Sequence, residues 1–162
     1  LGEVMQRRSR AGHFAPRAVA YEPRFASGAA WGANHNWREV QDKRINREGE
    51  NPVPHYWNHV FWVFGAKDME DFLAKSQDMN LNGHMDRIKV PFLVTHGVQD
   101  RQISPDYANQ TYDQLVNSSR RELKWFTPRE GGVEHVGADN HAFAIDYIAD
   151  WFAETLGGRT AG

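Results

Sequence analysis

The order of strands and helices in the second half of the chain limits the fold more than any other feature. Residues 88–96 (IKVPFLVTH) form a continuous apolar run rich in β-branched residues, which is typical of a strand buried on both faces. A helix signal at residues 104–116, a second strand at residues 122–127 and a closing amphipathic helix from Asn140 follow in that order. Strands that alternate with helices predict a parallel sheet flanked by helices, which is α/β architecture.

The first half of the chain adds a further strand and a helical segment. Residues 25–31 (FASGAAW) are small and apolar, which indicates a buried strand, and residues 17–24 read as the end of a helix stopped by Pro23. Residues 37–80 are charged or aromatic with helical spacing, and Asp68 is the expected N-cap of one helix. We therefore expect one domain over residues 1–162, with a helical insertion at about residues 37–80.

Composition argues against several classes of partner. The formal net charge is −2, from 19 basic and 21 acidic residues, so nothing suggests a nucleic-acid partner. The chain has no cysteine, which excludes disulfides and thiolate metal sites. The longest apolar run, residues 60–66, is far shorter than the roughly 20 residues of a membrane span, and no signal peptide is visible. We expect a cytoplasmic protein with no membrane partner.

Two candidate catalytic side chains follow the two strands of the second half. Asp100 lies in HGVQD, directly after the first strand, and His135 lies in GGVEH, after the second. Because the carboxyl ends of neighbouring parallel strands meet at one edge of a sheet, we expect these side chains to touch. A carboxylate that accepts a hydrogen bond from an imidazole fixes its tautomer and stabilises the imidazolium formed in proton transfer. The alternatives are a turn aspartate and a turn or capping histidine.

The two loop sequences are similar to those of a known family. The order strand, HGxxD, helix, strand, GGxEH, helix resembles the C-terminal half of an α/β-hydrolase, where the triad follows the chain order Ser, Asp, His. Residues 11–33, 91–104 (PFLVTHGVQDRQIS) and 131–140 (GGVEHVGADN) resemble a branch that includes fungal pigment polyketide-shortening hydrolases and 2,6-dihydroxypseudooxynicotine hydrolase. The resemblance spans about residues 9–157. It implies a partial α/β-hydrolase fold, with a helical lid inserted in the parallel sheet and with the N-terminal strands of the family missing.

The resemblance implies that Ser9 is the nucleophile. In the family this serine sits on a sharp strand-to-helix turn, G-x-S-x-G, and the next backbone N–H, here that of Arg10, donates to the oxyanion. Gly12 fits the pattern, whereas Arg7 and Ala11 replace its two glycines. A solvated serine in a run of basic residues is the alternative. Since the family's earlier strands would carry the second oxyanion amide, we expect a piece of a longer protein or a gene model with a damaged start.

Three polar residues near His135 are expected to have structural roles. Glu134 is adjacent to His135, and neighbouring side chains of an extended loop usually point apart, so Glu134 is not expected to be the triad acid. Asp139 and Asn140 directly precede the closing helix and are expected to cap it.

The helical insertion supplies the candidate substrate-binding residues. Trp57, Phe61 and Trp62 are expected on the inner surface of the lid, and plain core packing is the alternative. His55 and His59 are four residues apart, which is compatible with a metal site. Two ligands without a nearby carboxylate make a weak site, so packed histidines are favoured and no metal is expected.

The resemblance implies a hydrolase that works by acyl transfer through Ser9, His135 and Asp100. The resemblance implies a carbon–carbon bond of a β-diketone or aromatic polyketide as substrate, ahead of an ester, and no cofactor. The expected partner is a small apolar or aromatic molecule, and a homodimer is left open. The alternatives are an inactive fragment or pseudoenzyme with a degraded nucleophile turn, and a prolyl-oligopeptidase-type peptidase.

Overall fold

The computed structural model describes residues 3–8, 11–47 and 54–157. Within them the chain divides into two compact units. The first, called here the sheet unit, comprises residues up to His35 and from Leu81 onwards. The second, called here the helical unit, comprises Asn36–Asn80.

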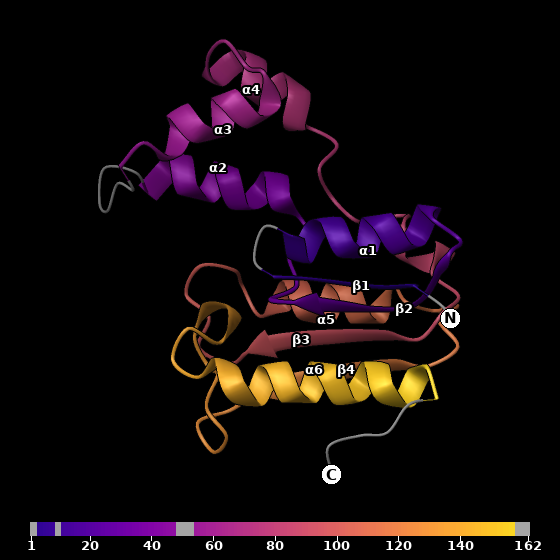
Figure 1. Ribbon diagram of the computed structural model, residues 1–162. Coiled ribbons are helices and arrows are strands. Elements are labelled where there is room, and N and C mark those ends of the chain that lie inside the picture. The colour runs from indigo at the N-terminus through magenta and orange to yellow at the C-terminus, as the bar shows by residue number, and fades with distance from the viewer. Residues whose placement is uncertain (1–2, 9–10, 48–53, 158–162) are drawn as a thin grey trace. The chain divides into compact units, whose positions relative to one another are not determined.

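Four parallel strands form the centre of the sheet unit (Figure 1). In sheet order they are β1 (Glu3–Arg8), β2 (Phe25–Trp31), β3 (Phe92–Gly97) and β4 (Arg121–Phe126). The parallel α/β sheet predicted from the sequence is therefore present. β3 begins at Phe92 rather than at Ile88, because Pro91 has no N–H for the ladder and Met85–Arg87 form a short 3₁₀ helix.

Strand β1 includes part of the basic segment of the sequence. Arg7 and Arg8 are its last two residues. Their strand conformation comes from pairing with β2, where Arg8 lies opposite Trp31. Tertiary pairing of this kind overrides the weak strand preference of charged residues.

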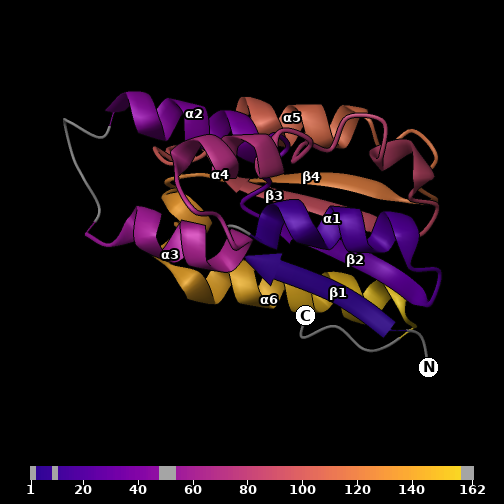
Figure 2. The same ribbon diagram turned by 90° about the horizontal axis from the view of Figure 1, so that it is seen from above.

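Helices cover both faces of the sheet (Figure 2). Helices α1 (Ala11–Tyr21) and α5 (Asp106–Asp113) pack on one face, and α6 (His141–Thr155) packs on the other. Helix α5 ends three residues before the predicted Val116, whereas α6 begins where the sequence indicates. Asn140 caps α6 by accepting a hydrogen bond from the Ala142 N–H at 3.2 Å.

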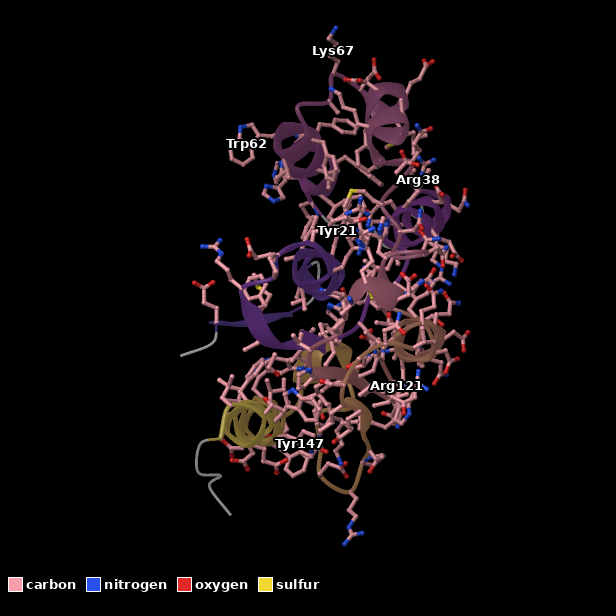
Figure 3. The ribbon with its side chains drawn as sticks, turned by 90° about the vertical axis from the view of Figure 1, so that its right-hand side faces the viewer. Tyr21, Arg38, Trp62, Lys67, Arg121 and Tyr147 are labelled. Carbon is pink, nitrogen blue, oxygen red and sulfur yellow. The ribbon has the colours of Figure 1, made fainter. Side chains whose placement is uncertain are left out.

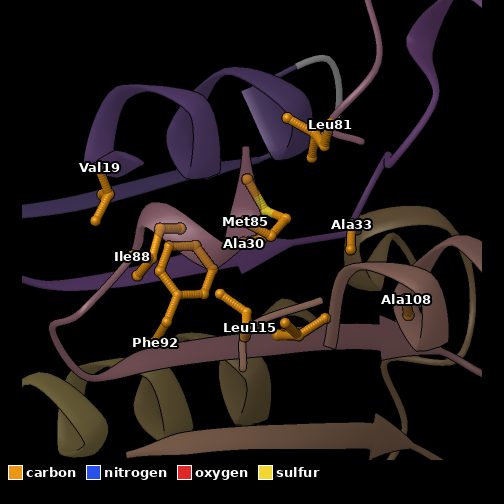
Figure 4. Close-up of a cluster of buried hydrophobic side chains, with 10 residues drawn as sticks. Val19, Ala30, Ala33, Leu81, Met85, Ile88, Phe92, Ala108 and Leu115 are labelled. Atoms are coloured by element: carbon orange, nitrogen blue, oxygen red, sulfur yellow. The ribbon is translucent and has the colours of Figure 1, made fainter. Parts of the chain in front are cut away.

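The core follows the alternation of side chains along the two central strands. Ala30 and Val94 face α1 and α5, in the cluster drawn in Figure 4, while Ala29 and Leu93 face α6. Full burial of a large apolar side chain contributes roughly 1.5–3 kcal/mol, so these two clusters hold the strands firmly. The carboxyl ends of the strands are consequently fixed in position, and the loops that leave them start from a rigid frame.

The helical unit contains α2 (Trp37–Arg47), α3 (Tyr56–Phe64) and α4 (Met69–Ser76). Its own core is built on Trp37, Val60 and Phe72. Asp68 caps α4 by accepting a hydrogen bond from the Asp71 N–H at 2.9 Å, as the sequence indicates. In the described part of the chain, no helix has the length and apolar character needed to cross a membrane.

Candidate active site

The candidate site lies at the carboxyl edge of the sheet, where the strands end. The loops after β3 and β4 lie side by side there, at the left-hand end of the sheet in Figure 1. Two backbone hydrogen bonds join them: Val98 N–H donates to Phe126 O at 3.1 Å, and Gln99 N–H donates to Val133 O at 3.0 Å. The residues that follow β3 are therefore held in register with those that follow β4.

Gly97 permits this close approach. A Cβ atom at position 97 would lie 2.2 Å from the carbonyl oxygen of Val133, far closer than a carbon and an oxygen that are not bonded can approach. Only glycine therefore lets the HGVQD and GGVEH loops lie against each other. The second letter of the HGxxD pattern thus has a packing reason in this molecule.

Asp100 is fixed by four groups. Its side chain is fully buried, and its Oδ1 accepts hydrogen bonds from the backbone N–H groups of Gln102 at 2.8 Å and Ile103 at 2.9 Å. Its Oδ2 accepts from His135 Nδ1 at 2.8 Å and lies 3.5 Å from His96 Nε2. Burial alone would raise the pKa of Asp100, but the hydrogen bonds from His135 and the Ile103 N–H outweigh it and lower that pKa. The group is therefore a carboxylate at neutral pH.

The structure brings Asp100 and His135 together across 35 residues of sequence. Because a carboxylate only accepts, the proton of this bond resides on Nδ1 of His135, which leaves Nε2 able to accept one. The His135 side chain is 12 % exposed, so the ring is partly open to solvent while its partner is not. This is the tautomer and the access that a general base requires.

Asp139 organises the loop that carries His135, which corrects its expected role as a helix cap. Its carboxylate accepts hydrogen bonds from the backbone N–H groups of Gly132 (2.8 Å), Val133 (3.2 Å) and Glu134 (2.9 Å). Three successive N–H groups therefore converge on one side chain, directly before His135. The N-cap of α6 is Asn140.

The residue after His135 has a strained backbone. Val136 has φ 49° and ψ 36°, a left-handed conformation that β-branched residues rarely adopt. Such strain persists only where the surrounding structure imposes it, and it concentrates at functional sites. Here it turns the chain sharply between His135 and Gly137.

Glu134 and Arg101 form a second link between the two loops. Arg101 follows Asp100, Glu134 precedes His135, and their side chains form an ion pair at 3.1 Å. Arg101 is 83 % exposed, so this pair lies outside the buried Asp100–His135 pair. The two residues also line a pocket of about 490 Å³, together with Val98, Gln99, Asp100 and Pro105. A ligand there would meet both a cation and a carboxylate.

Ser9 and Arg10 lie outside the described residues. The chain passes through them between β1, which ends at Arg8, and α1, which begins at Ala11. The start of α1 lies against the loop after β2, since a Cβ at Gly12 would be 2.2 Å from Gly32 O. A Cβ at Gly32 would in turn lie 4.0 Å from His135 Cε1. The loop after β2 is therefore in contact distance of both the start of α1 and the His135 ring.

The candidate substrate-binding residues all lie in the helical unit. Trp57 and Phe61 pack around Phe72 in the core of that unit, so core packing accounts for their burial. Trp62 is 79 % exposed, and Figure 3 shows its ring directed away from its helix. A role for these three residues in substrate binding stays a prediction.

Among the described residues, the two histidines of the helical unit do not gather with other potential metal ligands. His59 stacks on Trp62 with ring centroids 6.1 Å apart, and His55 has a left-handed backbone just before α3. In residues 3–8, 11–47 and 54–157, no group of three or more His, Asp or Glu side chains has the arrangement of a metal site.

Neither a protein-family model nor a curated protein sequence matches this chain. Several solved structures do match it. An esterase of Pyrococcus furiosus superposes with a TM-score of 0.66 at 15 % identity, over 95 % of this chain and 53 % of the esterase. A 2,6-dihydroxy-pseudo-oxynicotine hydrolase gives 0.69 at 17 % identity, over 97 % and 41 %. A puromycin-hydrolysing peptidase of Mycobacterium tuberculosis gives 0.68 at 15 % identity, over 98 % and 22 %.

The fold is a partial α/β-hydrolase fold. The chain spans about half the length, or less, of these structural neighbours. Their low identity establishes the fold alone, and none of them distinguishes the fungal pigment branch from other branches.

Sequence reasoning missed His96 and gave Asp139 only the role of a helix cap, although both lie within the quoted motifs. His96 opens the HGVQD pattern and lies against Asp100, four residues later. Asp139 follows the two glycines and reaches back to their loop. The signal available in the sequence was a titratable residue at the first position of HGVQD and another near the end of GGVEHVGADN, since each motif already held a catalytic candidate.

Proposed function

We propose that this chain carries a Ser-His-Asp triad and acts as a hydrolase by acyl transfer. The observation that carries the proposal is the 2.8 Å hydrogen bond from His135 Nδ1 to the buried Asp100 carboxylate, at the carboxyl edge of an α/β-hydrolase sheet. Chain order supports it, since Ser9 comes first, then Asp100, then His135. Functional groups of such sheets collect at this edge.

In the proposed reaction Ser9 Oγ attacks the substrate carbonyl carbon and His135 Nε2 takes the hydroxyl proton. Asp100 keeps the ring oriented and stabilises the imidazolium that forms. The C–X bond of the tetrahedral intermediate then breaks, His135 protonates the leaving group, and an acyl-serine remains. Water, deprotonated by His135, hydrolyses that ester and restores Ser9.

The position of Ser9 in the chain supports its assignment as nucleophile. Ser9 directly follows Arg8, which pairs with Trp31, and Trp31 directly precedes Gly32. A Cβ atom built at Gly32 would lie 4.0 Å from His135 Cε1, so this end of β2 is close to the His135 ring. The backbone N–H of Arg10 is the proposed oxyanion donor, as the residue after the nucleophile.

The proposed substrate is a small apolar or aromatic carbonyl compound. A carbon–carbon bond of a β-diketone or aromatic polyketide is proposed first and an ester second. The neighbours named as an esterase and as a 2,6-dihydroxy-pseudo-oxynicotine hydrolase support a choice within this range. Trp57, Phe61 and Trp62 are the proposed aromatic contacts.

A fluorophosphonate probe tests the triad directly. The probe loses fluoride as Ser9 Oγ bonds to phosphorus, and intact-mass and peptide mass spectrometry locate the adduct. We expect labelling of the 162-residue chain at Ser9, with none in Ser9→Ala and strongly slowed labelling in His135→Asn. Labelling at another residue, or no labelling of a chain that is folded by circular dichroism, contradicts the proposal and supports an inactive fragment.

A substrate panel separates the reaction classes. A β-diketone, a p-nitrophenyl ester and a proline p-nitroanilide are supplied to the same preparation. The neighbours include peptidases that hydrolyse puromycin and an acylaminoacyl peptidase, which supports the anilide as the second candidate substrate. Turnover of the anilide alone favours a peptidase over the proposed carbon–carbon or ester hydrolase.

A further inference from the structure

His96 contacts the catalytic loop from within the sheet. It is the penultimate residue of β3, is fully buried, and lies edge-on to Trp125 of β4 with ring centroids 6.0 Å apart. Its Nε2 lies 3.0 Å from the carbonyl oxygen of Ile103 and 3.5 Å from Asp100 Oδ2. One ring nitrogen therefore reaches both the start and the end of the turn that presents Asp100.

These contacts determine the tautomer of His96. A backbone carbonyl only accepts hydrogen bonds, so the Nε2 atom of His96 carries the proton and donates it to Ile103 O. Nδ1 is then a bare acceptor, and it is buried without a hydrogen-bond partner among the described residues. Burial lowers the pKa of His96, so the ring is neutral at neutral pH and acts through an N–H dipole rather than a full charge.

We propose that His96 is a positioning residue for the triad: its Nε2–H closes the Asp100 turn through Ile103 O and holds Asp100 Oδ2 toward His135. The backbone N–H groups of Gln102 and Ile103 hold only Oδ1. Oδ2 has His135 as its hydrogen-bonded partner and His96 as its second N–H neighbour. Without His96, the Ile103 carbonyl loses its donor and the carboxylate gains freedom to rotate away from the imidazole.

The consequence for catalysis rests on the proposed function, but the geometric role does not. A catalytic group held out of place by about 1 Å can cost on the order of 100-fold in rate. A supporting hydrogen bond that fixes a catalytic side chain is therefore expected to change turnover more than substrate binding.

Two amide substitutions test which ring nitrogen matters. The side-chain amide of Gln places an N–H near the position of imidazole Nε2, whereas that of Asn places it near Nδ1. His96→Gln can still donate to Ile103 O, and His96→Asn cannot. Thr95→Val is the matched control, since it also removes one buried hydrogen bond from β3 to a backbone carbonyl, that of Ala30, without touching the Asp100 turn.

The first readout is the His135 Nδ1–H cross peak in a ¹H–¹⁵N spectrum of histidine-labelled protein, assigned with His135→Asn. We expect this hydrogen-bonded signal in the native chain, in His96→Gln and in Thr95→Val, and its loss in His96→Asn. On a substrate from the panel, His96→Asn should lower kcat about 10- to 100-fold with KM little changed, and His96→Gln should keep most of kcat.

Equal behaviour of the two amide variants overturns the proposal. If both retain the cross peak, Asp100 does not need His96; if both lose it while Thr95→Val keeps it, ring packing rather than the Nε2 donor matters. The spectrum needs no turnover, so a chain that hydrolyses nothing still answers this question. Failure of the proposed function and failure of this inference are thereby distinguishable.

Discussion

The loops after β3 and β4 supply the two members of the hydrogen-bonded Asp100–His135 pair, but they are held in different ways. The first loop is fixed from inside: Asp100 is fully buried and contacts backbone N–H groups and a buried histidine. The second is fixed from outside, by the exposed Asp139 and by the Arg101–Glu134 pair.

The difference matches the chemistry each residue would perform. An acid that only orients and stabilises needs a dry, immobile place, because its interaction with the imidazole is strongest at low dielectric. A base must meet solvent and substrate, so its loop reaches the surface. We therefore expect substitutions in the first loop to change mainly the turnover rate and the packing of the core. Substitutions that weaken the outer contacts of the second loop should change the free energy of unfolding by an amount that depends on pH and salt.

The largest expected effect is that of Asp100→Asn. The new amide can still accept from the two backbone N–H groups, but its N–H₂ then faces His135 Nδ1 and favours the wrong tautomer. If the proposed function holds, kcat should fall on the order of 10⁴-fold, as the same change does in other triads. Asp113→Asn, on the exposed end of α5, should leave kcat unchanged; a similar loss in both variants would argue against a special role for Asp100.

Gly97→Ala tests whether the two loops depend on each other. The added methyl would meet Val133 O at 2.2 Å, so one loop must shift. We expect a loss of about 1–3 kcal/mol in the free energy of unfolding, measured with urea, together with loss of the His135 Nδ1–H signal. Gly83→Ala has open space around it and carries backbone strain that Gly97→Ala does not, because Gly83 has φ 69°, yet it should keep that signal. Retention of the signal in Gly97→Ala would mean that the loops are independent.

The sequence predicted much of this arrangement because the relevant patterns are local. Strand positions followed from apolar runs, and the helix cap at Asn140 followed from residue type. The meeting of Asp100 with His135 was expected from the rule that parallel strands end at a common edge.

The features that the sequence did not reveal depend on contacts between residues that come together only in the folded chain. Strand β1 carries charged residues and owes its conformation to pairing with β2. Asp139 precedes a helix, which is the pattern of a cap, and its real contacts exist only once the loop has folded back on it. The contact between His96 and Asp100 likewise requires the turn between them.

Asp139→Asn is expected to weaken the second loop in a pH-dependent way. Burial tends to raise the pKa of Asp139, but three backbone N–H groups outweigh it and lower that pKa in the folded chain. A lowered pKa means that the stabilisation is present above the unfolded pKa, about 4, and is lost as pH falls through the folded value. The variant should lose about 1 kcal/mol at pH 7 and show a flatter acid limb in urea titrations. Asp146→Asn is the exposed control, and equal acid limbs in all three proteins would refute the role of Asp139.

The smallest expected effect is that of Arg101→Ala, which removes the outer link between the loops. Because Arg101 is 83 % exposed, solvent screens its pairing with Glu134, and the free energy of unfolding should change by about 0.5 kcal/mol or less. The difference should shrink further in 1 M salt, where the Debye length is about 3 Å. Arg129→Ala, at an exposed position of the loop after β4, is the control. A larger, salt-insensitive loss in Arg101→Ala would show that the surface pair, and not the buried carboxylate, holds the base in place, and the contrast between the two loops would then be wrong.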